Sequence, residues 1–336
     1  MNKVTKLGVS ALCGSLAAVS AANAGELTVT GGVDMSWMSL DDVTTGNPIG
    51  MGSNLTFSGS GELDNGWNVA LSVAMTNADV YSNTNVVVTV PSLGDFRVDQ
   101  GTSGTGIDRI DDVTPTVWEE AWGMGLGTGI DTPAGSSKGS TIEYTPNMMP
   151  DGLTARIAYS PDASGSNAAD KGTAVTHGPE GSGYDIMLTA TDALHSVDGL
   201  TVYAGMSNIT QDSTSGFDGD QEERTWAVKY AAGGFTVGYQ WSEEDLGTST
   251  GALQYDNEGY GITFQVNDDL SIGYNHYESK QDNTTDVTAE ASSFQIAYSM
   301  GGASIRLAEG DVDNADYQTG ASYDKSGTTI SVSLAF

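Results

Sequence analysis

The stretch ISVSLAF, residues Ile330–Phe336, alternates strictly between apolar side chains and small or polar ones. A period of two is typical of a β-strand with one apolar face, because successive side chains of a strand point to opposite sides. Chain ends are usually polar and tolerant of loss. An apolar strand that finishes on the aromatic Phe336 therefore raises the expectation that this last strand is part of the fold itself.

The same alternation recurs along the chain, for example in WNVALSVAM (67–75), FTVGYQW (235–241) and LSIGY (270–274). No helical period of comparable length competes with it. Tight turns, such as Asp64–Gly66 and Gly301–Gly302, alternate with longer polar stretches, which are residues 160–182, 209–223, 243–257 and 279–290. This pattern predicts an all-β chain of about sixteen short strands in an up-and-down meander, forming one domain over residues 25–336.

A soluble sandwich or small barrel would also alternate, with its apolar face inward. Two features favour the opposite arrangement, with the apolar face outward. Sixteen strands are more than a small filled barrel holds, and aromatic residues gather at strand ends, namely Trp37, Trp67, Tyr159 and Trp241, as in an interfacial girdle. In hydrocarbon, such strands need a closed barrel to satisfy their backbone groups, so we expect a 16-stranded antiparallel transmembrane β-barrel.

One uncertainty in the strand count concerns the C-terminal segment. Residues 317–336 could form a hairpin around Lys325–Gly327, which would change the number of strands. We instead place residues 317–327 in the last loop, which keeps an even number of strands.

The N-terminal segment indicates export. Lys3 and Lys6 precede an apolar stretch, which ends at the A-x-A cleavage pattern Ala22–Ala24, so residues 1–24 are predicted to be a signal peptide. The only cysteine of the chain, Cys13, lies inside it. The formal net charge of −32 excludes nucleic acid as a partner, because binding to phosphates requires clustered basic side chains.

The chain resembles the trimeric general-diffusion porins of Gram-negative bacteria, most closely those of alphaproteobacteria. The resemblance rests on the cleavage site Ala22–Ala24, the alternating meander, the segment GDFRVDQG (94–101) and the terminal Phe336. It implies a homotrimer in the outer membrane of a Gram-negative bacterium, in contact with outer-membrane lipid and passing small hydrophilic solutes and ions. It also implies that Phe336 is the signal recognised by the outer-membrane assembly machinery.

In that family, the third loop folds inward and narrows the barrel. The long interval from Thr102 to Ser137 resembles this loop, and a structureless segment of such length is usually functional or disordered. Its acidic residues are the candidate constriction residues, which are Asp108, Asp111, Asp112, Glu119, Glu120 and Asp131. An exposed acidic loop is the alternative. The sequence departs from the family at Asp99–Gln100, where a Gly-Arg pair is common.

Four basic residues fall on the water-facing parity of their strands and are candidates for the pore wall: Arg97, Arg156, Lys229 and Arg306. Opposite an acidic loop they would set up a transverse field across the constriction. Charged residues would, however, collect on any water-facing parity, so the pattern alone does not establish this role. Acids of the other connections, such as Asp218–Glu223, are expected to be solvated and distant from the constriction.

Enzymatic chemistry is not expected. Gly135–Gly139 matches G-x-S-x-G, but no strand-to-helix elbow surrounds it, and the histidines His177, His195 and His276 are scattered over two connections and one strand end. No cofactor is predicted, although the acidic segments Asp218–Glu223 and Gly310–Asp316 could bind Ca²⁺ weakly or remain simply solvated.

The sequence therefore predicts a passive channel for ions and small hydrophilic solutes with a mild preference for cations. The alternatives are a substrate-selective channel of the same architecture and a plugged barrel with a structural or surface-binding role.

Overall fold

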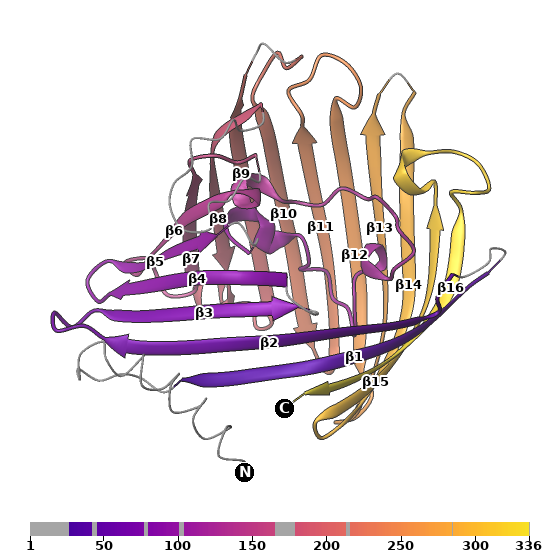
Figure 1. The fold of residues 1–336 in the computed structure, drawn as a ribbon, viewed down its shortest axis with the longest axis horizontal. Coiled ribbons are helices and arrows are strands. Elements are labelled where there is room, and N and C mark those ends of the chain that lie inside the picture. Colours follow the sequence, from indigo (N-terminus) through magenta and orange to yellow (C-terminus); the bar gives the residue numbers. More distant parts are fainter. Residues whose placement is uncertain are drawn as a thin grey trace, which may run out of the picture.

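The computed structural model describes residues 27–41, 46–76, 80–100, 104–164, 179–212, 216–283 and 285–335. The predicted signal peptide with Cys13, as well as Phe336, lies outside the described residues. Sixteen antiparallel strands form one closed barrel (Figure 1). The strands are β1 Thr28–Leu40, β2 Ile49–Glu62, β3 Asn68–Thr76, β4 Val80–Val90, β5 Gly94–Gln100, β6 Ser140–Pro146, β7 Leu153–Ser160, β8 Glu180–Ala190, β9 Leu200–Gln211, β10 Gln221–Ala232, β11 Phe235–Asp245, β12 Gln254–Gln265, β13 Leu270–Asp282, β14 Val287–Met300, β15 Ala303–Asp313 and β16 Lys325–Ala335.

Each strand pairs with its neighbours in sequence, and β1 pairs with β16 to complete the ring. In this seam, Trp37 lies opposite Ile330 and Met35 lies opposite Val332. The C-terminal strand thus has a partner on both sides, β1 and β15. This confirms the predicted sixteen-stranded barrel.

The two faces of the strands differ in the predicted sense. On β10, Trp226 and Tyr230 are exposed, whereas Thr225 and Ala227, on the opposite parity, are buried. Exposed large apolar side chains recur around the ring, for example Ile186 and Phe294, as on the lipid-facing side of a membrane barrel. We refer to the face with these apolar side chains as the outer face and to the opposite parity as the inner face.

The strands extend further into the polar stretches than the sequence predicted. Residues 209–223, 243–257 and 279–290 were expected to be loops, but β9 to β14 continue into them and leave connections of only 212–220, 246–253 and 283–286. In these parts the strands extend beyond the exposed apolar side chains of the outer face, so both of their faces are polar. The backbone pairing nevertheless continues. The stretch 160–182 likewise overlaps the end of β7 and the start of β8, and its residues 165–178 lie outside the described residues.

The hairpin around Lys325–Gly327 does not form. Residue Lys325 opens β16, and the last loop covers residues 314–324, with the short 3-10 helix η5 Ala315–Tyr317. The loop therefore begins and ends about three residues earlier than predicted, and the strand count remains sixteen. Helices are few, and within the described ranges none is both long and apolar enough to cross a membrane.

Candidate functional site

The long connection between β5 and β6 is packed against the barrel wall. It contains three short 3-10 helices, η1 Gly106–Ile110, η2 Ala121–Gly123 and η3 Gly135–Lys138. Figure 1 shows it in magenta, crossing the ribbons of the far wall. Ile107 and Ile110 have no exposed surface. We call residues 104–139 the inner segment.

Both ends of the inner segment are held by one carboxylate of the wall. Asp185, in the middle of β8, accepts hydrogen bonds from the backbone N–H groups of Ile107 (3.2 Å) and Ser136 (3.0 Å). Gly106 and Gly135 adopt φ angles of 56° and 54°, and a Cβ on either would come within 2.7 Å of an Asp185 oxygen. Glycine is needed at both positions because any side chain would meet this carboxylate as well as the left-handed backbone.

Two more wall carboxylates bind the same ends. Glu143 on β6 accepts a hydrogen bond from the N–H of Gly106 (2.8 Å) and forms an ion pair with Arg109 (2.7 Å). Glu223 on β10 accepts one from the N–H of Gly135 (2.9 Å). Both carboxylates are buried. The ion pair of Glu143 with Arg109 and the hydrogen bonds to the backbone N–H groups of Gly106 and Gly135 fix η1 and η3 to the inner face.

The middle of the inner segment is held by amide side chains. The side-chain oxygen of Gln295, on β14, accepts a hydrogen bond from the N–H of Trp118 (3.0 Å), and its amide group donates to the carbonyl oxygen of Glu119. Asn275, on β13, donates to the same carbonyl (3.3 Å). Gln295 and Asn275 are buried. The backbone of the segment therefore takes over hydrogen bonds that these inner-face amides would otherwise make with water.

Two glycines of the wall leave room for the backbone of the inner segment. Pro115 lies over Gly238 on β11 and Gly261 on β12, and a Cβ on either glycine would come within 2.5 Å of a Pro115 atom. Further along, the Lys325 ammonium group donates to the carbonyl oxygens of Leu126 (3.0 Å) and Gly127 (2.9 Å). The inner segment thus touches strands from β6 round to β16.

A cavity of ≈ 420 Å³ lies between the inner segment and the β1 side of the ring. Its lining includes Asp34, Met38, Trp118, Glu119 and Thr329. Acidic side chains from the wall and from the segment therefore face the same space.

The six predicted constriction acids all belong to the inner segment but differ in exposure. Asp112 and Glu119 are exposed, Asp108, Asp111 and Asp131 are half-buried, and Glu120 is buried. Burial raises the pKa of Asp111 to about 8, with Asp108 and Asp112 adding to the shift, and raises the pKa of Glu120 to about 7. Burial also raises the pKa of Asp108 and Asp131. The exposed Asp112 and Glu119 are the members of the set that best reach solvent.

Burial raises the pKa of Glu119 as well, whereas Arg306 acts in the opposite direction. The acidic charge of the segment at neutral pH is consequently smaller than its count of carboxyl groups suggests.

The four basic residues predicted for the pore wall have the inner-face parity of their strands. Arg97 is paired with Asp99 of its own strand (2.6 Å) and Arg306 with Asp34 (3.1 Å). The guanidinium of Arg306 also lies 5.9 Å from the centre of the Trp118 ring, and the Lys229 ammonium lies 5.9 Å from that of Tyr203. Arg156 is half-buried on β7. A common role of the four in a transverse field stays a prediction.

One acid was misplaced by the sequence analysis. Glu223 was expected in a distant solvated connection, but it is buried on the inner face and binds η3. Its neighbour Glu222 points to the outer face and pairs with Arg224 (3.1 Å). The strand alternation Gln221–Glu223–Thr225 was the signal that separates them. The segment Asp218–Glu223 is thus divided between two faces, and Ca²⁺ binding there stays a prediction.

Several residues that anchor the segment were not predicted as site residues: Glu143, Asp185, Arg109, Gln295, Asn275 and Lys325. The G-x-S-x-G match at Gly135–Gly139 is accounted for by η3, which is a 3-10 turn against the wall and not a strand-to-helix elbow.

Comparisons with known proteins agree with this architecture. The family model described as Gram-negative porin matches residues 8–336. A search of curated protein sequences found no match. Among solved structures, OmpT of Vibrio cholerae is similar with a TM-score of 0.68 at 13% identity, covering 94% of this chain and 99% of that one.

Two further structures are similar at the same identity. OmpF of Salmonella typhi, in a complex with daunomycin, has a TM-score of 0.67 at 13% identity, covering 93% of this chain and 98% of that one. The anion-selective porin from Comamonas acidovorans has a TM-score of 0.64 at 13% identity, covering 93% and 100%. These likenesses concern the fold, whereas the family match extends over nearly the whole sequence. The chain therefore belongs to the Gram-negative porin family.

Proposed function

We propose that the protein is a passive diffusion channel for ions and small hydrophilic solutes, narrowed by the inner segment and mildly selective for cations. As a Gram-negative porin it is an outer-membrane protein, and its family and fold point to a solute channel rather than to an enzyme. The observation that carries the proposal is the cavity between the inner segment and β1, which Asp34 and Glu119 line together.

The balance of charge around this cavity favours cations. Glu119 is exposed, and Asp34 is the ion-pair partner of Arg306, which would otherwise attract anions. Arg97 is likewise engaged by Asp99. The fold does not decide selectivity by itself, because the Comamonas porin of the same architecture is anion-selective. Selectivity in such pores depends on the charged side chains at the narrowest point.

Reversal potentials across a KCl gradient in planar bilayers test the selectivity. Asp112→Asn combined with Glu119→Gln should lower the preference for cations. Asp218→Asn combined with Asp220→Asn removes the same charge from the connection between β9 and β10 and should have a smaller effect. The difference should be largest at low salt, since screening acts over ~10 Å at 0.1 M but ~3 Å at 1 M. Equal effects of the two double variants would refute the proposal that the inner segment forms the constriction of the pore.

Single-channel conductance distinguishes a general diffusion channel from the two alternatives, a substrate-selective channel and a plugged barrel. A large ohmic conductance supports general diffusion. Block by one particular solute would favour a substrate-selective channel, and absence of conductance would favour a plugged barrel with a structural or surface-binding role.

We also propose that the chain forms a homotrimer, as OmpT of Vibrio cholerae does in its trimer form. The mass of the detergent-solubilised protein tests this. The proposed partners further include outer-membrane lipid and the assembly machinery, the latter through Phe336.

A further inference from the structure

The outer face of β12 to β15 carries a row of carboxylates in direct cross-strand register. Glu258 lies opposite Glu278, Glu278 opposite Glu290, and Glu290 opposite Asp313. All four have the parity of exposed apolar residues such as Phe294, so they point away from the pore. Like charges directly opposite one another destabilise a sheet. A cation bound to this row would therefore reduce the repulsion between its carboxylates.

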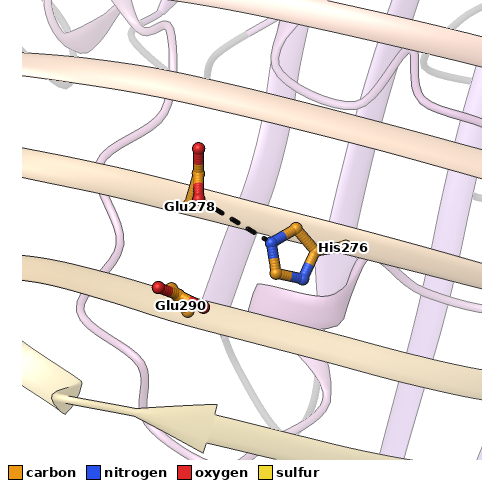
Figure 2. Close-up of side chains that lie close together, drawn as sticks. All are labelled: His276, Glu278 and Glu290. Carbon is orange, nitrogen blue, oxygen red and sulfur yellow. Dashed lines mark ion pairs between the residues drawn. The ribbon is translucent and has the colours of Figure 1, made fainter.

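A histidine stands within this row. His276 lies on the outer face of β13, two residues before Glu278, and its Nε2 is 3.9 Å from a Glu278 oxygen (Figure 2). The sequence analysis placed His276 at a strand end, but it is in the interior of β13. The Tyr260 ring lies against the imidazole, with 5.1 Å between ring centres. The backbone pairing and this ring contact restrict where the imidazole can lie.

Three of these side chains lie close together. His276, Glu278 and Glu290 each offer one ligand atom, and these atoms all lie within 4.8 Å of one another. Figure 2 shows Glu290 on the strand next to that of His276 and Glu278. The nearby cation Lys280 is engaged by Asp286 (2.9 Å).

We propose that His276, Glu278 and Glu290 bind a divalent transition-metal ion of the zinc class. Zinc binds imidazole nitrogen and carboxylate oxygen at ~2.0–2.2 Å, which in a tetrahedron places the ligand atoms ~3.4 Å apart. The three side chains need to approach by roughly 1.4 Å, which the flexible glutamates allow. Ca²⁺ and Mg²⁺ prefer oxygen ligands alone, whereas imidazole suits zinc and its neighbours. The imidazole therefore decides the class of ion.

Water can reach the site, and the pore is separate from it. The side chains of His276 and Glu278 are 18% and 42% exposed. Tyr274, on the same face, belongs to the apolar band, so the row begins where this band ends. The intervening inner-face residues Asn275 and Tyr277 hydrogen bond to the inner segment instead. A metal bound here lies on the outside of the wall.

Isothermal titration of the purified barrel in detergent with Zn²⁺ tests the proposal, with Co²⁺ absorption as a report of tetrahedral coordination. We expect one saturable site per chain that excess Mg²⁺ does not displace. His276→Ala, Glu278→Gln and Glu290→Gln should each weaken binding at least about tenfold, as loss of even supporting contacts at metal sites does. The matched control His195→Ala removes a histidine of a distant short helix and should bind as the wild type does.

The outcomes that overturn the proposal are distinct. The first is the absence of saturable Zn²⁺ binding by the wild type. The second is undiminished binding by a folded His276→Ala variant, which would mean that the carboxylates hold cations without the imidazole. Circular dichroism and resistance to SDS confirm that each variant forms the barrel. Because the site faces away from the pore, channel conductance should be the same with and without Zn²⁺ bound there.

Discussion

Replacement of Asp185 by alanine should release the inner segment while the barrel remains closed. Its carboxylate accepts two buried N–H groups, those of Ile107 and Ser136, at the two ends of the segment. A hydrogen bond to a charged group contributes ~1.5–3 kcal/mol, and a buried donor left without a partner costs a similar amount. Water that enters the space left by the side chain favours the low end, so we expect a loss of about 3 kcal/mol in docking, or more than about a hundredfold in the open population.

Hydrogen exchange of the detergent-solubilised protein, followed by mass spectrometry, measures this opening directly. Peptides from residues 104–139 should exchange much faster in Asp185→Ala, whereas peptides from β12 to β14 should not change. Asp185→Asn retains one acceptor and should lie between the two. Asp198→Ala, at an exposed position before β9, serves as a control. Unchanged exchange of residues 104–139 in a folded Asp185→Ala barrel would refute the anchoring role of this carboxylate.

Other predictions concern pH, the two faces of the wall, the packing of the segment and the C-terminus. The pKa of Asp111 is raised to about 8 and that of Glu120 to about 7, so the docked segment holds protons that a free segment releases near pH 4. Docking, measured by hydrogen exchange of residues 104–139, should therefore weaken as pH rises from 4 to 8. Cation preference, measured by reversal potentials, should increase between pH 6 and 9. Leu71→Arg, on the outer face of β3, should cost ~2–4 kcal/mol in lipid-folding titrations, whereas Ser72→Arg should cost little; equal losses would contradict the assignment of the faces. Gly261→Val should displace Pro115 and change single-channel conductance, and an unchanged conductance would show that this contact does not set the pore width. Deletion of Phe336 should impair assembly in cells more than refolding in vitro, and normal assembly would exclude its role as the signal.

The alternation of apolar and polar residues was sufficient to predict the number of strands and the closure of the ring. The lengths of β9 to β14 were not predictable in this way, because the strands continue beyond the apolar band, where both faces are polar. The anchoring role of Asp185 depends on partners 78 and 49 residues away in the sequence. Only the path of the folded segment brings these residues together, and the same path decides that Glu120 is buried while Glu119 is exposed.

The seam between β1 and β16 has a consequence for the order of folding. Its partners, such as Trp37 and Ile330, stand at opposite ends of the chain, and joining ends so far apart costs about 5 kcal/mol of loop-closure entropy when nothing else is formed. Prior pairing of each strand with its neighbours in sequence shortens this search, so we expect the seam to form last. Until then, β1 and β16 are both open edges that can pair with another chain. A cell that makes this protein must therefore shield two strand edges until the eleven-residue strand β16, Lys325–Ala335, has paired with β1.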